Sequence, residues 1–191
     1  MLALFIGLLL FIGVNLIRIF APDWRKQQIA RLGMLGWKGL YATVSLIGFA
    51  LMVWGYGQTR NDLALWVAPA GIGHLTALLV WIAFVLFAAT YFPANHFKAR
   101  LGHPMLLATK LWAFGHLLPN ARPGDLLLFG GLLAWSVFAF VASRKIDKRD
   151  GVTYPAGKVG NTIMVVILGT AVWAAFSMFA HVKLIGVKPY Y

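Results

Sequence analysis

Long apolar runs alternate with short polar segments along the whole chain. Five runs are long enough, or nearly so, to cross a hydrocarbon core, which takes about 20 helical residues. They cover residues 2–20, 39–58, 74–92, 126–142 and 162–180. A sixth run, 105–118, extends over only about 21 Å at the helical rise, so it is a short or tilted span or a re-entrant segment. The pattern predicts an all-α polytopic membrane protein with about six transmembrane helices.

Composition supports this class. Hydrophobic residues make up 61% of the chain and charged residues 12%, and the mean hydropathy is +0.78. A soluble core of this size could not bury that much apolar surface. We therefore expect one integral membrane domain over residues 1–191, whose first run stays uncleaved because no small-residue cleavage pattern follows it. The absence of cysteine from the sequence excludes disulfides, thiolate ligands and cysteine nucleophiles.

The basic residues are distributed unequally between the two sides of the predicted membrane. If all six runs cross, eleven of them share one side: Arg25, Lys26, Arg31, Lys38, Lys98, Arg100, Arg144, Lys145, Lys148, Arg149 and Lys158. Four lie on the other side: Arg60, Arg122, Lys183 and Lys188. The positive-inside rule makes the larger group cytoplasmic, so both termini face outward. Because the basic residues lie in short loops, we expect a lipid bilayer, and not nucleic acid, as the partner.

The segment 21–38 has its own amphipathic pattern. Basic residues there alternate with the apolar residues Trp24, Ile29, Leu32 and Leu35. This predicts an interfacial helix on the cytoplasmic face, with Asp23 as its N-cap after Pro22 and anionic lipid as its ordinary partner.

Ionisable side chains within apolar runs are the main candidates for a functional site, because burying them in a membrane is costly. His74 and His116 are predicted near the outer face, where they could meet. His103 lies at the inner end of the short run, and Lys110, seven residues later, lies on the same side of a helix. His116 follows His103 by thirteen residues and points away, so these two cannot hold one metal from one straight helix.

A second polar layer is predicted near the inner face. Asn15 and Arg18 are three residues apart in the first run, so they share a helix face. Lys110 needs a counter-charge, yet the chain has no glutamate and its aspartates fall in loops or at span ends. Either the lysine snorkels, or it loses its proton, or a ligand supplies an anion such as a propionate or phosphate.

Structural roles account for several of these residues as well. His103 could simply begin a helix at Pro104, and His74 could be an interfacial residue at a helix start. His96 is expected to be a solvated loop residue, and His181 an interfacial one.

Several motifs, in order, resemble the NnrU family of bacterial membrane proteins. They are RIFAPDWR from Arg18, WKGLY from Trp37, WGY from Trp54, GHPML from Gly102 and KLWAFGHLL from Lys110. The resemblance covers residues 1–144. It implies a multi-pass protein of the bacterial inner membrane, with both termini then periplasmic, and a genetic association with nitrite and nitric oxide metabolism in denitrification.

The family is more distantly similar to the 15-cis-zeta-carotene isomerase of plants and cyanobacteria, a haem b membrane enzyme. That similarity implies haem b as cofactor, with His116 as a metal ligand and His74 at the position of another histidine. Two positions depart from it, since Asn15 stands in place of the first-span histidine ligand and Ala113 in place of a cysteine. The implied function is haem binding with a redox or isomerase-like role on an apolar substrate. The cofactor-binding candidates are His116, His74, Lys110, His103, Asn15 and Arg18.

His103-Pro104 is also similar to the Arg-His-Pro motif of membrane methyltransferases of the isoprenylcysteine carboxyl methyltransferase kind. This resemblance implies S-adenosylmethionine as an alternative cofactor. The C-terminal acidic pair of those enzymes is not matched, since the corresponding segment holds Asp150 and Tyr154 and no glutamate. A non-catalytic membrane accessory protein is the third alternative, so the sequence leaves open whether the protein is an enzyme.

The six-span topology can be tested with reporter fusions. Fusions placed after Lys158 and after Tyr191 should report opposite sides of the membrane, because one span separates the two positions. The same side for both fusions would contradict the six-span interpretation.

Overall fold

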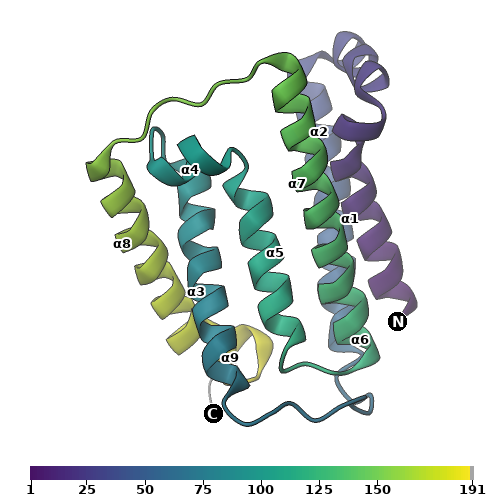
Figure 1. Cartoon of the computed structure of the whole chain (residues 1–191). Coiled ribbons are helices and arrows are strands. Elements are labelled where there is room, and N and C mark those ends of the chain that lie inside the picture. The colour runs from purple at the N-terminus through teal and green to yellow at the C-terminus, as the bar shows by residue number, and fades with distance from the viewer. Residues whose placement is uncertain (190–191) are drawn as a thin grey trace. The chain divides into compact units, whose positions relative to one another are not determined.

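The structure is a computed structural model that describes residues 1–189, and it contains helices and no strand within that range (Figure 1). Its elements are α1 (Leu2–Phe20), α2 (Pro22–Gly57), α3 (Ile72–Tyr91), α4 (His96–Leu101), α5 (Pro104–Leu117), α6 (Pro123–Asp125), the π-helical η1 (Leu126–Gly130), α7 (Gly131–Asp150), α8 (Val159–Ala175), the π-helical η2 (Phe176–Ala180) and α9 (His181–Ile185). Five segments of the described chain are long and apolar enough to cross a membrane: Leu2–Phe20, Pro22–Gly57, Ile72–Tyr91, Pro123–Asp150 and Val159–Ile185. The prediction of an all-α membrane protein is confirmed.

The sixth predicted run forms α5, which is only 14 residues long. Pro104 occupies its first turn, so the helix begins there. The short helix α4 precedes it, capped by Asn95, whose side chain accepts a hydrogen bond from the Lys98 amide at 2.8 Å. The Lys98 ammonium donates to the Thr90 carbonyl at 3.1 Å, which folds α4 back onto the end of α3. That α5 crosses the membrane stays a prediction.

The segment predicted as an interfacial helix is helical and forms the first part of α2, and its place at the membrane interface stays a prediction. Gly33, with φ 71° and ψ 164°, breaks the helix, so this part ends earlier than predicted. The rings of Trp24 and Trp37 meet edge to face at 5.8 Å across the break. The expectation that Asp23 is the N-cap is wrong, because Pro22 starts the helix and makes Ala21 the cap; Asp23 pairs with Lys26 at 3.1 Å instead.

The described chain forms two compact units, each considered by itself. The first comprises Met1–Trp66 and Ala121–Trp135, and in it α1 packs against α2. Glycine makes this contact close. A Cβ on Gly48 would lie 2.8 Å from the backbone nitrogen of Phe11, and one on Gly55 would collide with the backbone of Leu4. The two helix backbones therefore touch where these glycines lie, as small residues allow in membrane helices.

The second unit comprises Val67–Asn120 and Ser136–Tyr191, and in it α3 packs against both α5 and α8. The α3–α5 contact has at its core the buried residues Ala83, Leu86 and Ala108. The α3–α8 contact has Val85, Ala89 and Val165. Two hydrogen bonds add to this packing: Thr76 donates to the Gly115 carbonyl at 3.0 Å, and the Trp81 indole donates to the Thr170 hydroxyl at 2.9 Å. Thr76 near the start of α3 meets Gly115 near the end of α5, whereas Leu86, later in α3, clusters with Ala108, earlier in α5, so the two helices run in opposite directions.

One histidine differs from its expected setting. His96 does not lie in a solvated loop; it is half-buried and begins α4. Its backbone amide and its Nδ1 lie 3.0 and 2.8 Å from the Thr162 hydroxyl, which joins this turn to the start of α8. The apolar pattern could not reveal this contact because its partners are 66 residues apart.

The close α1–α2 contact makes a testable prediction. Gly55→Ala should lower the thermal unfolding midpoint of the detergent-purified protein, because overpacking of this kind costs about 1–3 kcal/mol. Gly13→Ala is the matched control on α1, since a Cβ there meets nothing within 4 Å. Equal midpoints for the two variants would contradict the close packing.

Candidate functional site

His103 lies at the start of α5, where it faces an aspartate from the end of α7. Its Nε2 is 2.8 Å from Oδ2 of Asp147, and the Tyr154 hydroxyl donates to the same oxygen at 2.7 Å. Both partners are largely enclosed, since the side chains of His103 and Asp147 are 20% and 9% exposed. Because a carboxylate only accepts, the hydrogen-bond pattern assigns a proton to Nε2 of His103.

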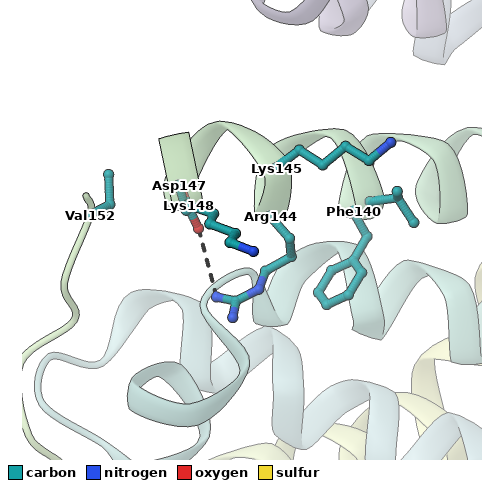
Figure 2. Close-up of a pocket in the computed structure, with 7 residues that line it drawn as sticks. Phe140, Arg144, Lys145, Asp147, Lys148 and Val152 are labelled. Carbon is teal, nitrogen blue, oxygen red and sulfur yellow. Dashed lines mark ion pairs between the residues drawn. The ribbon is translucent and has the colours of Figure 1, made fainter. Parts of the chain in front are cut away.

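Arg144, one turn before Asp147 on α7, completes this cluster. Its Nη1 lies 3.8 Å from Oδ2 of Asp147, the contact that Figure 2 marks. Hydrogen bonds and a nearby cation together stabilise the ionised form of Asp147. Gly102, with φ +74°, allows the approach: a Cβ there would lie 2.7 Å from Nη1 of Arg144 and 3.0 Å from the Tyr154 ring.

Phe140 on α7 links His103 to Lys110. Its ring meets the His103 ring edge to face at 6.5 Å, and the Lys110 ammonium lies 5.8 Å from the ring centroid. The two α5 residues therefore share one side of the helix, as their spacing predicted. Within residues 1–189 no carboxylate pairs with Lys110, and its partner is this aromatic face, a favourable cation–π arrangement. The apolar pattern of the sequence gives no sign of this contact.

A cavity of about 550 Å³ opens beside the cluster (Figure 2). Its lining comprises Phe140, Val141, Arg144, Lys145, Asp147, Lys148 and Val152. Along α7 the lining changes from aromatic and aliphatic side chains to three basic ones. The cavity is thus suited to a ligand that has an apolar part and an anionic part.

His116 lies at the opposite end of α5. Its Nδ1 is 2.8 Å from the Trp112 carbonyl, and the two rings lie 4.7 Å apart. A carbonyl only accepts, so Nδ1 carries the hydrogen and Nε2 has the lone pair in the neutral ring. A histidine that ligates a metal commonly donates its other ring nitrogen in this way.

His74 is exposed at the start of α3. The hydrogen bond from Thr76 to Gly115 places this end of α3 beside the end of α5 that carries His116. Among the described residues no three histidine, cysteine, aspartate or glutamate side chains gather as a metal site. An iron site here would therefore depend on one or two histidines.

Asn15 and Arg18 belong to the first unit. The Asn15 amide oxygen accepts a hydrogen bond from the Tyr41 hydroxyl at 2.6 Å, and its nitrogen donates to the Phe11 carbonyl at 2.7 Å. The oxygen of Asn15 thus takes part in the α1–α2 contact, and its nitrogen bonds within α1. Arg18 is exposed in the last turn of α1.

Sequence reasoning missed Asp147 as a site residue and related Tyr154 only to a methyltransferase pattern. The predicted span ended at residue 142, whereas α7 continues to Asp150 and so includes Asp147. The available signal was an aspartate three residues after Arg144, within the run of basic residues that follows that span.

A family model described as NnrU protein matches residues 3–189. The chain belongs to the NnrU family. The match continues past residue 144, where the sequence resemblance ended, and so includes Asp147 and Tyr154 of this NnrU protein. Comparison with curated proteins and with solved structures returns no match.

The enclosed Asp147 carboxylate makes a testable prediction for the NnrU protein. Asp147→Asn should destabilise it by about 1–3 kcal/mol, because a neutral amide oxygen accepts from His103 and Tyr154 more weakly than a carboxylate and loses the ion pair with Arg144. The measurement is the thermal unfolding midpoint in detergent. Asp150→Asn, on the same helix, should leave the midpoint unchanged because the Asp150–Arg149 pair is exposed. Equal shifts for the two variants would show that the Asp147 contacts contribute no specific stability.

Proposed function

We propose that this NnrU protein binds haem b through Nε2 of His116 in the bacterial inner membrane. One observation supports the proposal: the Trp112 carbonyl holds His116 in the tautomer whose Nε2 can ligate a metal. The Trp112 ring beside His116 provides an apolar surface of the kind that haem pockets have. His74, exposed at the neighbouring helix end, is the candidate for a second, weak ligand that a gas could displace. The charge asymmetry of the loops favours a multi-pass topology with periplasmic termini.

The contacts and positions of Asn15, Lys110 and His103 argue against a role as ligands of the iron. Asn15 is engaged by Tyr41 and Phe11, so it is not assigned to the iron. Lys110 precedes His116 by six residues, which places the two about 120° apart around the helix. Lys110 and His103 share Phe140 and are not assigned to the haem either. The arrangement favours iron with His116 as its one strong ligand.

Bound haem would supply redox or gas-binding chemistry. That chemistry suits a redox or isomerase-like role on an apolar polyene or quinone-like substrate, and it suits the association with nitrogen oxides that the family resemblance implies. The residues of this chain would bind and orient the cofactor through His116 and Trp112.

The haem proposal is tested by absorption spectroscopy of the detergent-purified protein supplied with haem. His116→Ala should abolish or shift the Soret band, because it removes the ligating nitrogen. His181→Ala is a matched control, since Nδ1 of His181 also lies near a backbone carbonyl, that of Val187 at 2.7 Å, and the variant should keep the band. The ferrous form should bind carbon monoxide, because a single strong ligand leaves one position open.

Two results would overturn the haem proposal. One is a purified, haem-supplemented protein with no Soret absorbance, which would favour a non-catalytic accessory protein. The other is an identical spectrum for His116→Ala and the unmodified protein.

One feature of the structure supports the methyltransferase alternative, and another argues against it. Asp147 supplies an acidic partner beside His103 and Tyr154. However, the adjacent cavity carries three basic side chains against one carboxylate, and the methyl donor S-adenosylmethionine is a sulfonium cation. Like charges repel strongly in a partly enclosed site, so the cavity favours an anionic ligand.

A further inference from the structure

We propose that the cavity at the charged end of α7 binds the phosphate headgroup of an anionic amphiphile, with Arg144 as the main phosphate ligand. This site is distinct from the haem site and depends on different residues. It is built from the end of α7 and the segment that follows it, and it lies beside the His103–Asp147–Tyr154 cluster.

The charge of the cavity favours an anion. Arg144, Lys145 and Lys148 line it, and Asp147 is the one carboxylate in the lining. The Asp147 carboxylate offsets one of these three positive charges, so the lining keeps an excess of positive charge. Clefts lined by one sign of charge concentrate ligands of the opposite sign.

Arg144 is held in position before any ligand binds. Asp147 lies 3.8 Å from its Nη1, and the missing side chain of Gly102 makes room for the same nitrogen. The side chain remains 46% exposed, so its outer face can meet a ligand. A guanidinium has five N–H donors in a planar fork that suits two phosphate oxygens at once, and holding it in place lowers the entropy lost on binding.

The apolar part of the lining argues for an amphiphile and against a free phosphate ion. Phe140 and Val141 belong to the apolar stretch of α7, and the basic lining residues begin one turn later. Lysine and arginine at the ends of membrane helices lie at headgroup level. A lipid could therefore place its phosphate against Arg144 and its first methylene groups against Phe140 and Val141.

The experiment is native mass spectrometry of the full protein purified in a nonionic detergent. The protein is titrated with phosphatidic acid and, separately, with phosphatidylcholine of the same acyl chains. We expect phosphatidic acid to bind at least tenfold more tightly. Arg144→Gln should remove most of that preference. Arg149→Gln is the matched control on the same helix, since Arg149 pairs with Asp150 and does not line the cavity; it should change the preference less than twofold.

Each other outcome overturns the proposal in a defined way. Equal losses in Arg144→Gln and Arg149→Gln would mean general surface attraction and no site. Equal affinity for phosphatidic acid and phosphatidylcholine would show that the site does not select an anionic headgroup. Displacement of phosphatidic acid by millimolar inorganic phosphate, or equal affinity for phosphatidic acid and for glycerol 3-phosphate, which has no acyl chain, would show a free-anion site. For the proposed site, affinity should rise about fourfold for each methylene that becomes buried. Unfolding midpoints of the variants, measured in parallel, identify any loss due to misfolding.

Discussion

The carboxylate of Asp147 joins three parts of the second unit. It ties the start of α5 through His103, the segment after α7 through Tyr154, and its own helix through Arg144. A charged group with little exposure is tolerable only when it is paired and hydrogen-bonded, so these contacts depend on one another. If any partner is removed, the remaining polar groups stay buried without a hydrogen bond, which lowers the stability of the fold. The cavity lies beside this cluster, and one of its cations, Arg144, lies 3.8 Å from the same carboxylate.

The two ends of α5 differ in chemistry. At its start, the Asp147 carboxylate accepts from Nε2 of His103; at its end, the Trp112 carbonyl accepts from Nδ1 of His116. A histidine beside a carboxylate is suited to holding or moving a proton, whereas one beside a carbonyl presents its other nitrogen as a neutral ligand. The proposals for haem and for an anionic amphiphile therefore rest on different residues, and either can fail without the other.

The sequence was a sufficient guide to the fold class and a poor guide to polar contacts. Apolar runs of membrane-spanning length require helices, because backbone groups in lipid must be satisfied within the segment. The same pattern says nothing about which loop meets which helix. It therefore placed His96 in solvent and Asp23 at a helix cap, whereas tertiary contact with Thr162 and the position of Pro22 decide otherwise.

The sequence by itself determined the helical membrane architecture and the shared helix face of His103 and Lys110, because these depend on local periodicity and composition. Its ordered motifs also indicated the family. Only the tertiary structure decided that Asp147 and Tyr154 belong with His103, that Lys110 faces Phe140, and that Asn15 is engaged by Tyr41. Asn15 and Tyr41 are 26 residues apart in the chain, His103 and Asp147 are 44 apart, and His103 and Tyr154 are 51 apart. Contacts between residues so far apart arise from how the helices pack. The side-chain periodicity of one helix shows which residues share a face, and it does not show which other helix packs against that face.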